Sequence, residues 1–250
     1  MYIMNEDLKK LKKEFIRIKN MGYVEASRSG TTGIGKTFED LLGKKDDRLG
    51  SPDYNGIEIK TKRSYSRAYI TLFNATPNGN DEYEIKRLRN DFGYPDKILK
   101  NKKVLNVSVQ GNCSTLVADR YLFKLEINYD ESKIYLVIYD KYMNFIEKES
   151  FWEFNILKDK LEIKFKYLAL IKAWPQNINN KEYYKYYDIE FYKLKSFEDF
   201  LYLIEDGTIR VTFKIGVFRK GTRIGDIHDR GTGFEIQEID LYKLFDNLIV

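Results

Sequence analysis

The sequence is poor in cysteine, in proline and in long apolar runs. Cys113 is the only cysteine in 250 residues, which rules out an intramolecular disulfide and favours a reducing compartment over a secreted setting. The apolar runs are short, such as YLALI at 167–171, and the N-terminal MYIMNEDLKKLKKEF contains no apolar core of signal-peptide length. Neither a membrane span nor a secretory signal is therefore expected, and we predict a cytoplasmic protein.

The composition is that of a globular protein with a mixed surface charge. Apolar residues make up 43% of the chain and aromatic residues 15%, enough to bury a sizeable core. The 43 Lys and Arg residues exceed the 38 Asp and Glu residues, for a net charge of +5. This excess permits an anionic partner such as nucleic acid without requiring one.

Helical and strand periodicities alternate along the chain, which predicts an α/β protein with a mixed central sheet. IEIKTK and AYITLF alternate apolar and polar residues and predict a hairpin-like pair of strands. Ser150 and Ser196 are each predicted to cap a following helix. Other predicted elements are helices at 5–21 and about 36–42, a hairpin at 121–140 and a buried strand at 166–174.

The segment GTTGIGKTFEDLLG matches the Walker A pattern through Gly30, Gly35, Lys36 and Thr37. A working Walker A loop needs a buried strand before the first glycine and a long helix after the Lys-Thr pair. Here the preceding residues YVEASRS are mostly polar, and the following helix is short. We interpret the match as coincidental, although IYLVIYD resembles a Walker B strand and keeps a P-loop NTPase as an alternative.

A second constellation, D-x₄-E-x-K, lies in SPDYNGIEIKTK, with Asp53 at a bend and Glu58 and Lys60 two residues apart on the next strand. A period of two places Glu58 and Lys60 on one face of that strand. Two carboxylates with a lysine suit metal-assisted phosphodiester cleavage, because the acids hold Mg²⁺ and the ammonium orients water and offsets oxyanion charge. The alternative is an ordinary exposed ion pair.

Taken together, GTTGIGKTFEDLLG, PDYNGIEIKTK and YITLF resemble the catalytic core of the MvaI and BcnI restriction endonucleases, relatives of the mismatch-repair nickase MutH in the PD-(D/E)xK superfamily. KYLALI and HDRGTGF are similar to MvaI segments in matching order, so the resemblance covers nearly the whole chain. It implies a restriction-endonuclease-like α/β core, with a catalytic lobe over about residues 1–175 and a smaller DNA-recognition lobe over about 176–250.

The resemblance also implies roles for individual residues. Asp53 and Glu58 would bind Mg²⁺, and Glu39 would be an auxiliary acid unless it is an ordinary exposed helix residue. Lys166 would be a second lysine of the site, or else a lysine at a strand end whose charge reaches water. The implied catalytic set is Asp53, Glu58, Lys60, Glu39 and Lys166.

Sequence specificity requires a further element, since hydrolysis at a metal site reads no bases. Arg and Lys side chains contact guanine edges, and Asp contacts cytosine, so the charged loop between the last predicted strands suits a G/C-containing site. The resemblance implies that this site is of the CC-x-GG type. Two departures from the family pattern, Lys214 in place of Arg and Arg230 in place of His, leave the exact site open; the alternative is a solvated basic hairpin tip. The DNA-binding candidates are Lys36, Lys214, Arg219, Arg223, His228, Asp229 and Arg230.

These observations predict a type II restriction endonuclease that cuts double-stranded DNA with Mg²⁺. The resemblance implies a monomer, and a cognate DNA methyltransferase as its functional partner in the same system. The alternatives are a MutH-like strand nickase, a P-loop NTPase and a non-catalytic DNA-binding protein.

Overall fold

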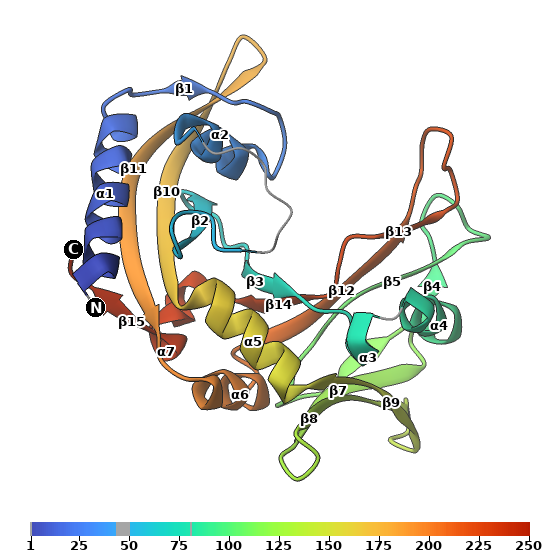
Figure 1. The fold of residues 1–250 in the computed structure, drawn as a ribbon. Coiled ribbons are helices and arrows are strands. Elements are labelled where there is room, and N and C mark those ends of the chain that lie inside the picture. Colours follow the sequence, from blue (N-terminus) through green and yellow to red (C-terminus); the bar gives the residue numbers. More distant parts are fainter. Residues whose placement is uncertain (1, 44–50, 81) are drawn as a thin grey trace. The chain divides into compact units, whose positions relative to one another are not determined.

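The structure, a computed structural model, describes residues 2–43, 51–80 and 82–250, and its helices and strands confirm the predicted α/β class with mixed sheets (Figure 1). No helix in these ranges is long and apolar enough to cross a membrane. The helices are α1 (Tyr2–Lys19), α2 (Gly33–Leu41), α3 (Pro77–Asn80), α4 (Glu82–Phe92), α5 (Phe154–Phe165), α6 (Phe197–Glu205), the 3-10 helix η1 (Glu238–Asp240) and α7 (Leu241–Leu244).

The strands come from both halves of the chain. Several short ones, including β4 and β13, carry no periodic pattern long enough to be predicted. The strands are β1 (Val24–Glu25), β2 (Glu58–Arg63), β3 (Ile70–Asn74), β4 (Tyr94–Pro95), β5 (Lys103–Val109), β6 (Thr115–Val117), β7 (Tyr121–Asn128), β8 (Lys133–Asp140), β9 (Phe145–Glu153), β10 (Tyr167–Ile178), β11 (Lys181–Leu194), β12 (Arg210–Val217), β13 (Ile227–Asp229), β14 (Gly233–Ile236) and β15 (Phe245–Leu248).

The chain forms two compact units, each assembled from separate segments. The first contains Met1–Ala68, Glu162–Lys195 and Phe245–Val250, and the second contains Tyr69–Leu161 and Ser196–Leu244. The sequence predicted one boundary near residue 175, but that position lies inside β10, which pairs with β11 from end to end. A division there would separate the two strands of one hairpin, so it does not match the compact units.

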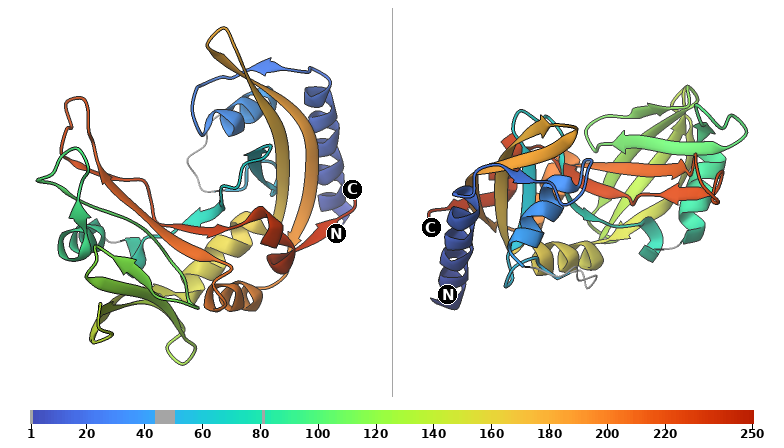
Figure 2. Two further views of the ribbon diagram at one scale, coloured as in Figure 1. Left: turned by 180° about the vertical axis from the view of Figure 1, so that it is seen from behind. Right: turned by 90° about the horizontal axis from the view of Figure 1, so that it is seen from above.

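The first unit is built on a five-stranded sheet with the order β1-β11-β10-β2, to which β15 adds beside β11. β10 runs antiparallel to β11 and parallel to β2, which places a segment from residues 58–63 beside one from residues 168–173. Helix α1 packs on β11, as Figures 1 and 2 show, and buries the apolar stripe predicted from the sequence. That stripe consists of Leu8, Leu11, Phe15 and Ile18.

Two predictions of local structure were wrong. β2 and β3 do not form a hairpin, because β2 pairs with β10 and β3 pairs antiparallel with β14. Ser150 does not cap a helix; it is buried within β9, and α5 begins only at Phe154. The alternation of residues fixed β2 and β3 as strands but not their partners, whereas residues 150–153 were predicted as helix and extend β9, which pairs with β8.

The second unit contains a six-stranded and a four-stranded sheet. The predicted hairpin at 121–140 is confirmed as the antiparallel pair β7 and β8, and Ser196 caps α6 by accepting a hydrogen bond from the Asp199 amide. Aromatic side chains fill the core: the indole of Trp152 meets the Phe234 ring edge-on at 5.6 Å, and Phe234 stacks on Phe73 at 5.1 Å.

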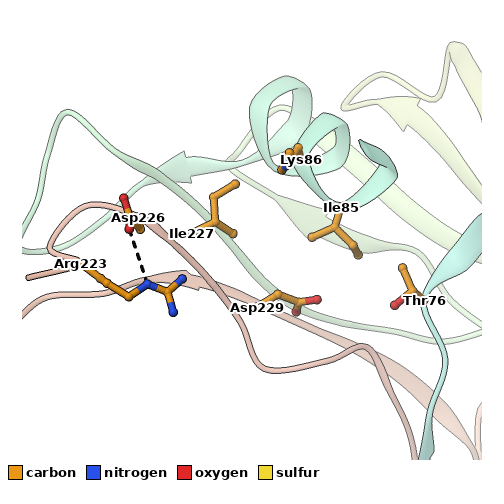
Figure 3. A pocket seen from close by; sticks show the side chains of 7 residues that line it. All are labelled: Thr76, Ile85, Lys86, Arg223, Asp226, Ile227 and Asp229. Carbon is orange, nitrogen blue, oxygen red and sulfur yellow. Dashed lines mark ion pairs between the residues drawn. The ribbon is translucent and has the colours of Figure 1, made fainter. Parts of the chain in front are cut away.

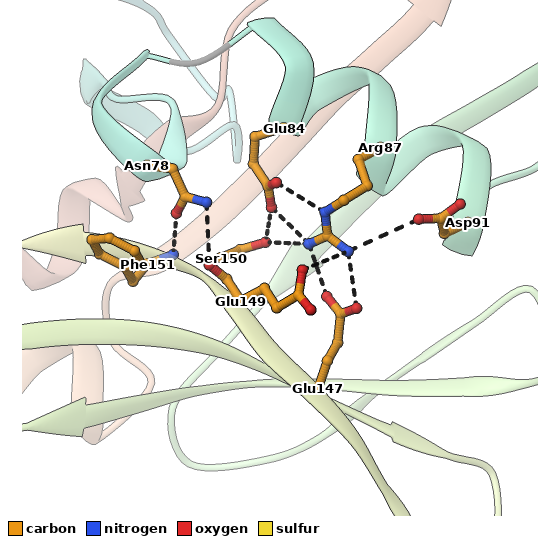
Figure 4. A network of polar contacts seen from close by, with 8 residues as sticks. All are labelled: Asn78, Glu84, Arg87, Asp91, Glu147, Glu149, Ser150 and Phe151. Atoms are coloured by element: carbon orange, nitrogen blue, oxygen red, sulfur yellow. Dashed lines mark hydrogen bonds and ion pairs between the residues drawn. The ribbon is translucent and has the colours of Figure 1, made fainter.

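A buried ion-pair network ties α4 to β9 in this unit (Figure 4). The guanidinium of Arg87, 12% exposed, donates to both carboxylate oxygens of Glu84 at 2.8 and 2.9 Å and to both oxygens of Glu147 at 2.8 and 2.9 Å. Ser150 donates to Glu84 as well. Burial opposes ionisation of Glu84, but the bonds from Arg87 and Ser150 outweigh it and lower the pKa of Glu84. The network therefore keeps Glu84 ionised although its side chain is buried.

Replacing Arg87 should destabilise the fold strongly, because Glu84 and Glu147 would remain close together with no positive partner. We expect Arg87→Ala to lower the free energy of unfolding by about 3–5 kcal/mol in urea titrations. The matched variant Arg89→Ala removes a guanidinium from the same helix that bonds only its neighbour Asn90 among the described contacts, and should change stability by less than about 1 kcal/mol. Equal effects of the two variants would contradict the importance of the network.

Candidate active site

Strand β2 carries the predicted acid and lysine on one face. Glu58 is 1% exposed, and its Oε1 lies 2.6 Å from Nζ of Lys60. The Lys60 ammonium also lies 5.4 Å from the centre of the Phe165 ring. Ile57 and Ile59 are buried, as the alternation predicted. The two-residue period of the strand therefore places Glu58 and Lys60 side by side at the edge of the core.

Asp53 reaches the same strand through a tight turn. Tyr54 and Ile57 exchange backbone hydrogen bonds at 2.8 and 2.9 Å, and the turn between them is closed by Asn55 and Gly56, both with positive φ. The Asp53 Oδ2 accepts a hydrogen bond from the Ile59 amide at 3.0 Å, which fixes the carboxylate beside β2. The structure therefore brings together Asp53, Glu58 and Lys60 as the sequence predicted.

The second lysine at this site is Lys164 rather than the predicted Lys166. Nζ of Lys164, in the last turn of α5, lies 3.4 Å from Oε1 of Glu58. Lys166 lies between α5 and β10 with an exposed side chain, and its carbonyl accepts the Leu194 amide. Lys164 and Lys166 are two residues apart, on either side of the residue at which α5 ends. The position of that helix end therefore decides which of the two lysines faces Glu58.

The electrostatics of Glu58 suit a cation ligand. Burial raises the pKa of Glu58, the negative charge of Asp53 raises it further, and Lys60 and Lys164 act in the opposite direction. Oε2 of Glu58 is buried and accepts no hydrogen bond from the described residues. No group of three or more His, Cys, Asp or Glu side chains in the described part of the chain could hold a metal. Mg²⁺ needs only one or two carboxylates when phosphate and water complete its shell, so Asp53 and Glu58 fit it.

The glycine segment forms a helix start and not a phosphate loop. α2 begins at Gly33, so Lys36 lies inside the helix and pairs with Asp40 at 3.0 Å. The preceding strand β1 has only two residues and is not buried. Gly33 is required for packing, since a Cβ there would lie 2.3 Å from the Arg28 carbonyl oxygen. These features agree with the interpretation of the Walker match as coincidental.

Glu39 lies on α2 with a half-buried side chain. Its charge contributes to the raised pKa of Tyr186, which burial causes in the main. The structure thus places Glu39 near the end of Tyr186, whose hydroxyl donates to the Ile34 carbonyl at 2.7 Å.

In the second unit, two predicted DNA-binding residues are engaged in ion pairs with buried acids. Arg219 donates to Asp96 at 2.6 Å, and this bond, with the Leu99 and Ile98 amides, lowers the pKa of Asp96. Lys214 lies 2.6 Å from Glu235. Burial opposes ionisation of Glu235, but bonds from Lys214 and Arg210 outweigh it and lower its pKa. Sequence reasoning missed both acids, because neither stands in a charged cluster of the sequence.

The remaining candidates lie on the loop that follows β12. The rings of Phe218 and His228 stack with their centres 4.1 Å apart. Cζ of the Arg223 guanidinium lies 4.2 Å from the centre of the Phe218 ring. Asp229 is exposed and accepts the Gly231 amide at 2.9 Å. Arg230 is exposed, with one weak bond of 3.4 Å to Asn106. Arg223, Asp229 and Arg230 therefore present most of their polar atoms to solvent.

A cavity of about 440 Å³ adjoins this loop within the second unit (Figure 3). Arg223 and Asp226 pair at 3.5 Å on one side, and Asp229 and Thr76 lie on another. Its lining combines both signs of charge with Ile85 and Ile227. Lys86 of α4 completes the wall.

Comparisons with known proteins agree with this geometry. The family model described as the MvaI/BcnI restriction endonuclease family matches residues 12–245. A solved complex of the restriction endonuclease MvaI with cognate DNA substrate is 34% identical, covering 97% of this chain and 98% of that chain with a TM-score of 0.89. MvaI in the absence of DNA is also 34% identical, covering 97% of each chain with a TM-score of 0.62.

A search of curated proteins gave no match. The family match nevertheless spans almost the whole chain, and a solved structure with the same fold over 97% of this chain is 34% identical in sequence. Asp53, Glu58 and Lys60 of the D-x₄-E-x-K pattern lie together at strand β2. This chain belongs to the MvaI/BcnI restriction endonuclease family.

Proposed function

We propose that this type II restriction endonuclease hydrolyses double-stranded DNA at a short G/C-containing site of the CC-x-GG type, with Mg²⁺ held by Asp53 and Glu58. The observation that carries the proposal is the buried Oε2 of Glu58, which has no hydrogen-bond donor among the described residues, beside a second carboxylate. A buried carboxylate oxygen without a donor is destabilised until a cation binds it.

Each candidate residue of the first unit has its own role in the hydrolysis. When bound, Mg²⁺ polarises the scissile phosphate and offsets the charge that develops on its oxygens. Nζ of Lys60 positions the attacking water and stabilises the same developing charge. Lys164, which lies beside the same Glu58 oxygen as Lys60, favours the ionised carboxylate. Glu39 is an auxiliary acid, and Lys36 contacts the DNA backbone.

Base recognition falls to the exposed side chains of the second unit. Arg230 faces guanine through its two terminal nitrogens, and Asp229 accepts from the amino group of cytosine. Arg223 and His228 contact the same site. Arg219 and Lys214 reach DNA only as members of ion pairs with Asp96 and Glu235, so their orientation is set by the protein before DNA arrives.

We expect the enzyme to act as a monomer, as the family resemblance implies. Each chain carries one D-x₄-E-x-K constellation, so a monomer cuts one strand at a time. A cognate DNA methyltransferase protects the host sites in the same system. The relative whose structure was solved with cognate DNA supports DNA as the partner of this chain.

The first test is cleavage of a supercoiled plasmid that carries one site. With Mg²⁺, nicked circles should accumulate before linear DNA, since a single active site cuts the strands in sequence. Asp53→Ala should slow both steps by at least about 10³-fold, because a metal ligand is lost, while binding to cognate DNA without Mg²⁺ persists. Cleavage by Asp53→Ala at the wild-type rate would refute the active site, and sequencing the product ends would define the site recognised.

The two neighbouring lysines provide a matched pair. Lys164→Ala should lower the cleavage rate by about 10- to 100-fold, because the buried Glu58 carboxylate then loses one of the two lysines that compensate its charge. Lys166→Ala should stay within about twofold of the wild type, since that side chain is exposed. Both rates are measured in single-turnover cleavage. A larger effect of Lys166→Ala than of Lys164→Ala would identify Lys166 as the second lysine of the site.

Arg230 and Arg219 should differ in the kind of binding that they support. Arg230→Ala should weaken cognate binding by about 10- to 100-fold and random binding little, as expected when a bidentate base contact is lost. Arg219→Ala should weaken both alike, because it leaves the buried Asp96 without its partner and disturbs the loop. Affinities for cognate and random duplexes at two salt concentrations separate these results; equal losses for Arg230→Ala would make it a backbone contact.

A further inference from the structure

The turn that follows the catalytic strand presents an aromatic ring to solvent. The Ser66 amide bonds the Arg63 carbonyl at 3.1 Å, which closes a turn directly after β2. Tyr65 occupies this turn with a φ of 63° and is 96% exposed. The bulky side chain of Tyr65 thus lies in solvent. Its backbone adopts the left-handed conformation that glycine and asparagine adopt more easily.

The conformation of Tyr65 is unusual for its residue type. Of the nine non-glycine residues with positive φ in the described ranges, Tyr65 is the only aromatic one. Most of the others are Asn, Asp or Ser, whose short side chains suit such turns. Strained residues of this kind concentrate at functional sites, where the surrounding structure holds them in place. The exposed ring gains almost no packing contacts that would offset the backbone strain, so the turn itself does not explain a tyrosine here.

The two residues that precede Tyr65 are firmly anchored. Nη2 of Arg63 donates to the Gly30 carbonyl at 2.7 Å, to Glu182 at 2.9 Å and to the Tyr184 hydroxyl at 2.9 Å. The Ser64 amide bonds the Ala173 carbonyl at 2.9 Å, which continues the pairing of β2 with β10. The turn is therefore a rigid extension of the catalytic strand and not a frayed loop end.

The position and charge of the turn suit DNA. Tyr65 lies five residues after Lys60, so its Cα is at most about 18 Å along the chain from that of the catalytic lysine. Successive base pairs are about 3.4 Å apart, so this distance is about five steps of duplex. Cations flank the ring at Lys62, Arg63 and Arg67, and a basic segment with an exposed aromatic ring is typical of nucleic-acid contacts.

We propose that Tyr65 is a DNA-contact residue, whose ring packs against a nucleotide of the duplex near the scissile phosphate. The anchored turn holds the ring in the orientation that binding requires, which explains a strained backbone at an exposed tyrosine. The inference rests on the proposed function, since it needs DNA bound at Glu58 and Lys60. It adds a contact from the catalytic strand's own turn to those of the loop that follows β12.

The test compares variants that separate the ring from the backbone strain. Tyr65→Gly relieves the positive φ and removes the ring, whereas Tyr65→Phe keeps the ring. Tyr142→Ala is the control, because Tyr142 is also exposed in a turn, between β8 and β9, but the positive φ there belongs to Met143. Binding of fluorescently labelled cognate duplex is measured without divalent metal at several salt concentrations, together with the melting temperature of each protein.

We expect Tyr65→Gly to raise Kd by about 5- to 100-fold, the size typical of a lost aromatic contact to a base. The slope of log Kd against log salt should not change, because no charge is removed. The melting temperature should be equal to or above that of the wild type, and Tyr65→Phe and Tyr142→Ala should bind within about twofold of it.

Unchanged affinity of Tyr65→Gly, with a wild-type protein that cuts DNA, would overturn the inference alone. A lower melting temperature accompanying weaker binding would instead give Tyr65 a structural role, and a smaller salt slope would assign the loss to displaced cations; either result overturns the proposed contact. A wild-type protein that neither binds nor cuts DNA would overturn the proposed function itself.

Discussion

The carboxylate of Glu58 is buried, and the rest of the active site is arranged around that burial. A charged carboxylate in a protein interior is unstable unless cations and hydrogen bonds surround it. Lys60 and Lys164 supply positive charge to Oε1, and Oε2 remains without a donor among the described residues. Under the proposed function, the same imbalance that makes Glu58 unfavourable in the free protein would favour the binding of a divalent cation there.

The arrangement depends on the parallel pairing of β2 with β10. Glu58 lies opposite Leu168, and this register brings the end of α5, with Lys164, to the carboxylate. A parallel pair needs a long connection between its strands, and in this chain the connection is most of the second unit. β2 and its partner β10 are therefore distant in sequence, and the segments of the two units alternate along the chain.

Charged residues in the second unit serve two purposes that the sequence does not separate. Arg219 and Lys214 neutralise the buried acids Asp96 and Glu235, so their charge is already used within the fold. The side chain of Arg230 is exposed, and among the described residues its one hydrogen bond is the weak bond to Asn106. Such a difference matters for DNA recognition, because a cation paired with a buried acid is fixed in place, whereas an exposed one retains donors for a base.

The sequence by itself determined the α/β class, the family and the D-x₄-E-x-K constellation, because each depends on spacing within a short segment. A period of two places Glu58 and Lys60 on one face, and a turn of a few residues returns Asp53 to them. The partners of β2, the interleaved units, the choice of Lys164 over Lys166 and the buried acids Asp96 and Glu235 were decided only by the tertiary structure. Each of these is a contact between residues far apart in the chain, and local periodicity carries no information about which distant segment completes a sheet or neutralises a charge.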